Sequence, residues 1–159
     1  MGTYDVALVC MNGHMINDSF LKYPEHNIPY CDKCGAATIC SCPHCNAKIR
    51  GEYDVPGVAV IGGLTETPAY CYSCGKPYPW TEERLKAIRE TIELSEISEQ
   101  EKNEFNSNLP DIISETPRTK LAALKIKTIG AKIGKDIWAV AKDILVDIAS
   151  ETAKKTMGL

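Results

Sequence analysis

The sequence lacks the features by which membrane-spanning and secreted proteins are recognised. None of its apolar runs reaches the roughly 20 residues that a membrane-spanning helix needs. Residues 1–5 have neither the basic stretch nor the apolar stretch of a secretory signal peptide. We therefore expect a cytoplasmic protein, and in that reducing compartment the 8 cysteines should stay free of disulfides.

Seven of those cysteines and one of the 3 histidines have the spacing of metal ligands. Three pairs follow the pattern C-x2-C and one follows C-x3-H, so each pair fits on a single tight turn. Thiolate and imidazole are the groups that bind zinc in structural sites. We predict two structural zinc ions as cofactors, with the ligands Cys10, His14, Cys31, Cys34, Cys42, Cys45, Cys71 and Cys74.

The residues beside these pairs indicate tight turns. Gly35, Asn46 and Gly75 each directly follow the second cysteine of a pair, where the backbone of a metal-binding turn needs a positive φ. The first pair encloses Asn12-Gly13, a strong hairpin-turn signal that follows the strand-like residues 6–9. All four pairs are therefore expected on turns.

The loop lengths favour a tandem arrangement, in which the first two pairs share one metal and the last two pairs share the other. An interleaved cross-brace, as in RING-type domains, would join the first pair to the third and the second pair to the fourth. Cys40 lies outside the pairs and is an alternative to His14 as a ligand. The C-x3-H spacing favours His14.

Two catalytic uses of these residues are disfavoured. Cys42-Pro43-His44-Cys45 matches a redox motif of thioredoxin-fold oxidases, but residues 46–51 have the pattern of a turn and a strand, and that chemistry needs a helix. Zinc hydrolases and deaminases keep an open coordination position beside a carboxylate base, and His14 lacks the glutamate of an H-x-E motif. We expect no enzyme, and no small-molecule substrate is evident.

Composition divides the chain into three segments and predicts an α+β protein. Residues 1–80 hold every cysteine and histidine, with 5 basic and 7 acidic side chains, and predict a small, β-rich double zinc ribbon whose best strand is residues 58–61. This segment has few large apolar residues, so metal should supply much of its folding free energy. Residues 81–115 carry 10 acidic and 4 basic side chains and predict acidic helices. Residues 116–159 predict a long amphipathic helix or helices, so that the C-terminal half forms a helical hairpin or bundle.

Capping signals place the helices. Thr81, which precedes two glutamates, predicts the N-cap of a helix that runs to about Glu96. Ser98 and Glu101 predict a capping box for a second helix, which Pro110 should end. In the last segment, apolar residues recur at steps of three or four and form one stripe: Ala122, Ile126, Ile129, Ile133, Ile137, Val140, Ile144 and Ile148.

A helix with such a stripe must bury it against something. Gly130 and Gly134, near the stripe, mark a weak point or a close backbone approach. Residues 118–135 contain 6 basic side chains and no acidic one, which fits the acidic segment before them, an anionic membrane surface or another partner. We favour packing within the chain or self-association.

Motifs along most of the chain also resemble the bacterial family of unknown function called DUF2321. The motifs that carry the resemblance are Val9-Cys10 with Asn12-Gly13-His14, Tyr30-Cys31-Asp32-Lys33-Cys34-Gly35-Ala36, Cys42-Pro43-His44-Cys45, Ile49-Arg50-Gly51, Cys71-Tyr72-Ser73-Cys74-Gly75 and Tyr78-Pro79-Trp80-Thr81. The resemblance implies a bacterial zinc-ribbon protein. It implies no activity, because the family has none assigned.

The sequence therefore favours a non-enzymatic, zinc-binding adaptor with a protein partner, in which the ribbons present a binding surface and the helices pack or oligomerise. A nucleic-acid-binding ribbon is one alternative, since Lys33, Lys48, Arg50 and Lys76 lie near the predicted turns, although the zinc segment has a net negative charge. A RING-like adaptor and a protein held at a membrane surface by its C-terminal helix are the others.

Overall fold

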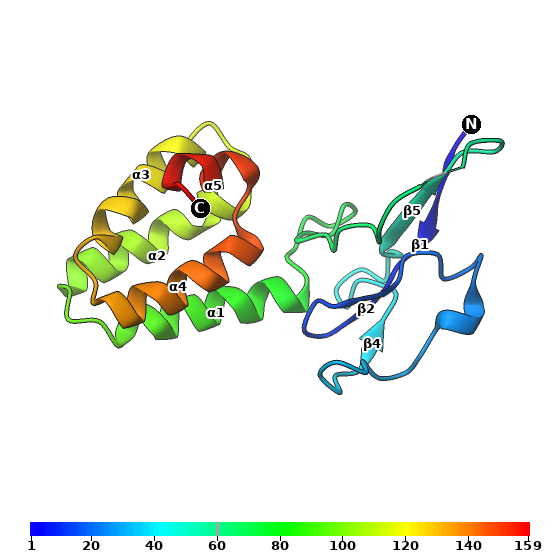
Figure 1. Cartoon of the computed structure of the whole chain (residues 1–159), viewed down its shortest axis with the longest axis horizontal. Helices are drawn as coiled ribbons and strands as arrows, with labels where there is room; N and C mark the ends of the chain where they lie inside the picture. The colour runs from blue at the N-terminus through cyan, green and yellow to red at the C-terminus, as the bar shows by residue number, and fades with distance from the viewer. Residues whose placement is uncertain (60) are drawn as a thin grey trace. The chain divides into compact units, whose positions relative to one another are not determined.

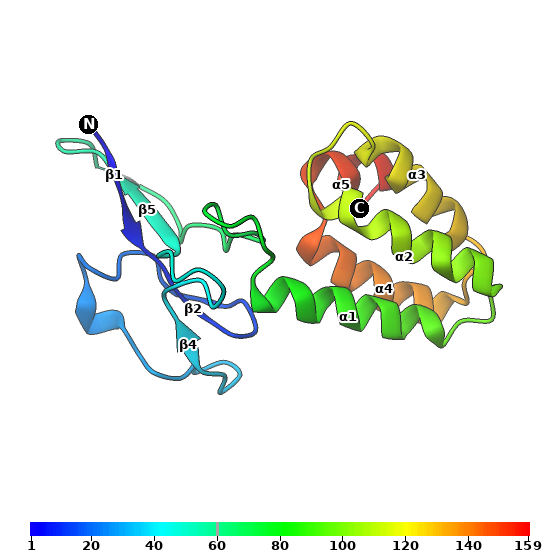
Figure 2. The same ribbon diagram turned by 180° about the vertical axis from the view of Figure 1, so that it is seen from behind.

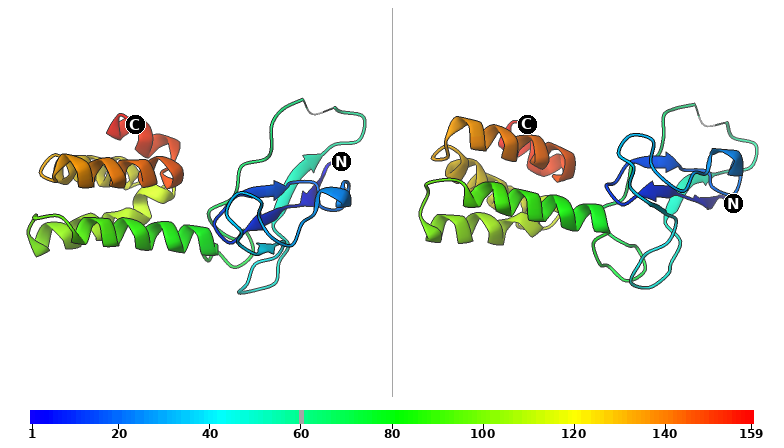
Figure 3. Two further views of the ribbon diagram at one scale, coloured as in Figure 1. Left: turned by 60° about the horizontal axis from the view of Figure 1, so that its bottom comes forward. Right: turned by 90° about the horizontal axis from the view of Figure 1, so that it is seen from below.

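The computed structural model describes residues 1–59 and 61–159, which form two compact units, Met1–Glu82 and Glu83–Leu159 (Figure 1). The strands belong to the first unit, and no strand lies among the helices of the second (Figure 3). This segregation confirms the α+β class. The strand predicted at residues 58–61 includes Val60, which is outside the described residues, and its neighbours Val58, Ala59 and Ile61 are not in a strand.

The first unit contains two small antiparallel sheets. One sheet pairs β1 with β5, and the other has the order β3-β2-β4. The bounds are β1 Thr3–Val6, β2 Leu8–Cys10, β3 Met15–Asn17, β4 Thr38–Ile39 and β5 Arg50–Asp54, with a 3-10 turn η1 at Pro24–His26. These sheets are short because the chain is repeatedly interrupted by the cysteine turns.

The core of this unit is correspondingly small. Ala7, Val9 and Ile49 are fully buried, and beside them the rings of Tyr78 and Trp80 stack with their centroids 4.7 Å apart. Two cysteines, Cys42 and Cys71, belong to the same cluster of buried side chains. The apolar core and one set of predicted metal ligands are therefore contiguous.

Gly51 in β5 lies where the chain has no room for a side chain. A Cβ at this position would overlap the backbone carbonyl of Asp18, which accepts a hydrogen bond from the backbone N–H of Glu52 at 2.7 Å. We expect Gly51→Ala to lower the free energy of unfolding of this unit by about 1–3 kcal/mol, because the two backbones must separate. Chemical unfolding of the metal-replete protein measures this.

Gly63→Ala is the matched control, because a Cβ there meets no atom within 4 Å. Equal stability of the two variants would show that the close approach at Gly51 is not required.

The second unit is formed by helices, the first of which begins in the other unit (Figures 1 and 2). The bounds are α1 Pro79–Glu93, α2 Glu99–Ile113, α3 Thr119–Gly130, α4 Lys135–Ile148 and α5 Glu151–Met157. Helix α3 packs against both α2 and α5. None of the helices in the described ranges is both long and apolar enough to cross a membrane.

Two predicted helix boundaries are wrong. Helix α1 begins at Pro79, so Thr81 lies inside the helix, and its hydroxyl donates to the carbonyl of Ala69 at 2.8 Å and caps nothing. The capping box of Ser98 and Glu101 is present at the start of α2, but the helix continues through Pro110 to Ile113. It continues because Leu109, Ile112 and Ile113 are buried, which outweighs the single backbone hydrogen bond that proline cannot make.

The C-terminal segment, for which a long helix or several helices were predicted, is divided into three helices. The chain turns between Gly130 and Gly134. At Gly134 the ψ of 143° is outside the helical range. A Cβ at Gly130 would overlap the ring of Trp138, so a larger residue there would force the ring to move. A second break precedes α5, whose N-cap Ser150 accepts a hydrogen bond from the backbone N–H of Ala153.

The turn after α3 also changes which side chains of α4 are buried. Ala141, Leu145 and Ile148 face the core, whereas Val140, which the stripe placed inside, is 51% exposed. Trp138 meets Phe105 of α2 edge to face, with ring centroids 6.5 Å apart. The stripe assumed one continuous helix. Because the chain turns between α3 and α4, the buried face of α4 is not the continuation of that stripe, and Val140 lies outside it.

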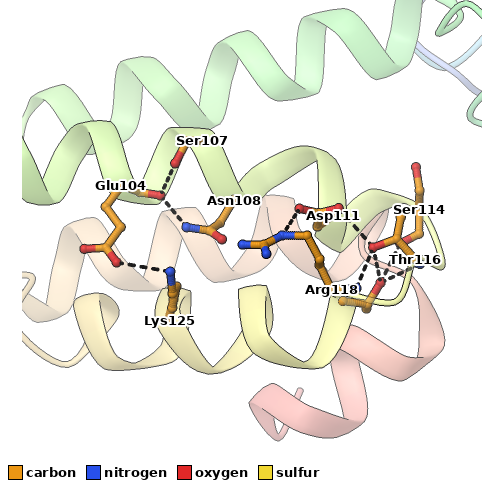
Figure 4. A network of polar contacts seen from close by, with 9 residues as sticks. Glu104, Ser107, Asn108, Asp111, Ser114, Thr116, Arg118 and Lys125 are labelled. Carbon is orange, nitrogen blue, oxygen red and sulfur yellow. Dashed lines mark hydrogen bonds and ion pairs between the residues drawn. The ribbon is translucent and has the colours of Figure 1, made fainter.

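Ion pairs join the basic helix α3 to the acidic helix α2 (Figure 4). Lys125 pairs with Glu104 at 3.7 Å, and Arg118 at the start of α3 pairs with Asp111 at 3.6 Å. Lys132, just after α3, pairs with Glu101 at 2.6 Å. Three of the 6 basic side chains of residues 118–135 therefore find acidic partners within the same helical unit.

Candidate metal centres

The three C-x2-C pairs among the four ligand pairs lie on turns with the same backbone structure. In each turn the residue before the first cysteine forms an antiparallel bridge with the residue three positions after the second, giving the pairs Tyr30–Ala37, Ser41–Lys48 and Tyr70–Pro77. The residue after the second cysteine has a positive φ, 74° at Gly35, 63° at Asn46 and 75° at Gly75. The predicted role of these three residues is confirmed.

The remaining pair occupies a hairpin between β2 and β3. Gly13, with a φ of 91°, donates its N–H to the carbonyl of Cys10 at 2.8 Å, and the N–H of Cys10 donates to the carbonyl of His14 at 3.0 Å. Cys10 is the last residue of β2, so the sheet fixes the position of the Cys10/His14 pair.

The hairpin and the first turn place four ligand atoms together, which we call cluster 1: Cys10, His14, Cys31 and Cys34. Nδ1 of His14 lies 3.4 Å from Sγ of Cys10 and 3.6 Å from Sγ of Cys31. Sγ of Cys10 lies 3.7 Å from Sγ of Cys34. All four atoms lie within 4.8 Å of one another, so the cluster could hold one metal ion.

The second and third turns form cluster 2 in the same way: Cys42, Cys45, Cys71 and Cys74. Sγ of Cys42 lies 3.8 Å from Sγ of Cys74, and Sγ of Cys45 lies 3.7 Å from Sγ of Cys71. The first cysteine of each pair is buried and the second is exposed. The site therefore lies at the edge of the small core, with one side toward solvent.

The two clusters give the tandem arrangement of pairs. The interleaved cross-brace is not what the described residues form. Cys40 belongs to neither cluster, and its nearest polar contact is Nζ of Lys48 at 3.9 Å from the sulfur. His14, and not Cys40, completes cluster 1.

Backbone N–H groups directed at the sulfurs favour their ionised form. The backbone N–H of Ala36 and the side-chain amide of Asn12, which is 3.3 Å from Sγ, lower the pKa of Cys34 to about 6. The N–H groups of Cys74 and Ser73 do the same for Cys71, whose pKa is also lowered to about 6. In each cluster the backbone thus favours a thiolate, the form that binds metals.

A second thiolate in cluster 2 is electrostatically unfavourable. The backbone N–H of Lys76 lowers the pKa of Cys74, but loss of solvent and the sulfurs of Cys42, Cys71 and Cys45 together raise it to about 11. Like charges so close together oppose each other, and a bound cation removes that opposition. The electrostatics of cluster 2 therefore favour a positive ion among the four sulfurs.

Two contributors to these centres were not predicted as site residues. Asn12 was interpreted only as a turn former, although its amide also donates to the sulfur of Cys34. Tyr78 lies against cluster 2, where burial first and the sulfur of Cys71 next raise the pKa of its hydroxyl. The position of Asn12 between two ligands was the available sequence signal for it, and the position of Tyr78 shortly after the last cysteine pair was the signal for Tyr78.

Two separate sets of four ligand side chains, followed by a helical unit, give this small protein two candidate metal centres. The chain belongs to the bacterial family DUF2321, described as an uncharacterized protein conserved in bacteria, whose family model matches residues 3–157. This match confirms the resemblance seen in the motifs. Neither the curated proteins nor the solved structures contain a match to it.

Proposed function

We propose that this protein binds two structural zinc ions and acts as a non-enzymatic, cytoplasmic protein-binding module. The observation that carries the proposal is the presence of two complete sets of four Cys and His ligands. Soft thiolate ligands with at most one imidazole are the donor set of structural zinc sites.

The separations between ligand atoms support zinc. A tetrahedral zinc ion with bonds of about 2.3 Å to sulfur and about 2.0 Å to nitrogen holds two sulfurs about 3.8 Å apart, and a sulfur and a nitrogen about 3.5 Å apart. The sulfur–sulfur separations of 3.7, 3.8 and 3.7 Å agree with this geometry. So do the sulfur–nitrogen separations of 3.4 and 3.6 Å.

A structural role follows from the number of ligands. Catalytic zinc keeps one coordination position for water or substrate, whereas four protein ligands close the tetrahedron. The small core of residues 1–82 also needs another source of folding free energy, and a structural zinc ion provides on the order of 10 kcal/mol in small zinc-binding peptides. Zinc in this protein would therefore hold the turns that carry the binding surface.

The helical unit supports a role in packing or self-association. On α3 and α4 the large apolar side chains Leu121, Leu124, Val140 and Val146 are exposed. Leu121 and Leu124 are three residues apart on α3, so they share one face of that helix, where a protein contact would cover them. Pairing of half the basic residues of 118–135 with α2 leaves less charge for an anionic membrane, so a protein contact is preferred.

Cobalt substitution tests the structural role of the metals. Cobalt(II) replaces zinc in such sites, and its visible absorption reports coordination number and thiolate ligation. We expect strong tetrahedral bands that do not change when cyanide or azide is added, because no coordination position is open. Bands that shift with either anion would reveal an exchangeable position and contradict the structural assignment.

A further inference from the structure

A tyrosine-lined groove lies beside cluster 2 in the first unit. It has a volume of about 190 Å3, and its lining includes Tyr4, Arg50, Glu66, Pro68, Tyr70 and Tyr72. These residues come from β1, from β5 and from the segment that leads into the third cysteine turn. The groove is therefore a property of the folded unit and of no single motif.

Arg50 is held between two aromatic rings at this groove. Its guanidinium carbon lies 3.9 Å from the ring centre of Tyr72 and 4.6 Å from that of Tyr4. Tyr72 is 55% exposed and Tyr4 is 51% exposed, so the stack lies at the surface. Among the described residues no carboxylate forms an ion pair with Arg50. Stacking thus fixes the guanidinium while its N–H donors stay free for a ligand.

The wall of the groove is fixed by hydrogen bonds. The indole N–H of Trp80 donates to the carbonyl of Pro68 at 2.8 Å, and the backbone N–H of Tyr78 donates to the carbonyl of Ala69 at 3.0 Å. Tyr70 and Tyr72 flank the ligand Cys71, so cluster 2 sets their positions. Because the groove is already formed, little free energy is lost to ordering its side chains when a ligand binds.

We infer that this groove binds a linear peptide segment in which an acidic residue stands next to a proline or an aromatic residue. A guanidinium group matches a carboxylate with two parallel N–H···O bonds. Tyrosine-lined grooves accept proline rings and extended backbone. The volume of the groove suits one such side chain beside the carboxylate.

A nucleic acid fits this surface less well. Among the described residues of the lining, Arg50 is the only basic one; the lining also contains Glu66, and residues 1–80 carry a net negative charge. Nucleic-acid binding draws most of its affinity from several cations that meet successive phosphates. One guanidinium group beside tyrosines therefore fits a single carboxylate on a peptide better than a row of phosphates.

This inference rests on the proposed role as a protein-binding module, and its test uses the zinc-loaded full chain. A displayed library of random short peptides is selected on the protein, and the affinity of the enriched peptide is measured by calorimetry. We expect enriched peptides to share an acidic residue next to proline or an aromatic residue. Changing that acidic residue to its amide should weaken binding by about tenfold or more, since a charge-assisted pair is lost.

Variants of the protein complete the test. Arg50→Lys keeps the positive charge but removes the two parallel N–H donors of the guanidinium, and Tyr72→Ala removes one stacking ring. Each change should weaken peptide binding by about tenfold and leave the zinc content unchanged. Arg89→Lys, at an exposed position on α1, is the matched control and should bind normally.

Three outcomes would overturn the inference: no peptide family is enriched, binding is insensitive to Arg50→Lys and Tyr72→Ala, or oligodeoxythymidylate displaces the peptide and binds more tightly. Each leaves the zinc count of the same samples intact, so failure of this inference is separable from failure of the zinc assignment.

Discussion

Replacing Cys74 with serine should lower the bound metal below two ions per chain and disorder the first unit while the helices persist. The change removes a sulfur that lies 3.8 Å from Sγ of Cys42 and breaks the set of four ligands in cluster 2. Structural zinc contributes on the order of 10 kcal/mol, which is comparable with the entire stability of an ordinary domain, about 5–15 kcal/mol. The small core around Ile49 and Tyr78 does not offset such a loss.

Amide NMR spectra together with metal analysis measure this result. Signals from residues 1–82 should lose their dispersion, and those of residues 83–159 should keep theirs. Cys40→Ser is the matched control, because Cys40 belongs to neither cluster, and it should retain both ions and the full spectrum. A Cys74→Ser protein with two ions and an unchanged spectrum would remove Cys74 from the ligand set.

The second large effect concerns the core of the helical unit. Leu145 on α4 is fully buried, so Leu145→Ala should lower the free energy of unfolding by about 2–5 kcal/mol through lost contacts and the cavity left behind. Val140, also on α4 and 51% exposed, should tolerate Val140→Ala within about 0.5 kcal/mol. Urea unfolding followed by the helical circular dichroism signal measures both.

This pair of variants distinguishes two registers of α4. The apolar stripe of the sequence places Val140 and Ile148 on the buried face, whereas the structure buries Ile148 together with Ala141 and Leu145 and leaves Val140 exposed. A larger loss for Val140→Ala than for Leu145→Ala would support the stripe and contradict the structure of this helix.

The cysteine turns were predictable because their determinants are local. A C-x2-C spacing followed by Gly35, Asn46 or Gly75 specifies the turn, and the observed positive φ values agree. The grouping of ligands followed from loop length, because each cluster joins pairs that are neighbours along the chain. Such features depend on a few residues that are close in sequence, so they can be predicted from the sequence.

The misplaced features depend on contacts that are distant in sequence. Thr81 has the signature of an N-cap, but its hydroxyl bonds to Ala69, and the helix starts earlier at Pro79. Pro110 remains inside α2 because buried neighbours hold that helix together. The break at residues 131–134 places Trp138 against Gly130, a packing that helical periodicity does not report. The groove around Arg50 was missed for the same reason, since its tyrosines come from separate segments.

Native mass spectrometry of the zinc-replete protein tests the central claim most directly, because one spectrum counts the metal ions on each 17.5 kDa chain. The two clusters predict two zinc ions per chain, fewer than two after Cys34→Ser or Cys74→Ser, and two ions after Cys40→Ser. Fewer than two ions on the unmodified protein, or two ions retained by either ligand variant, would contradict the account.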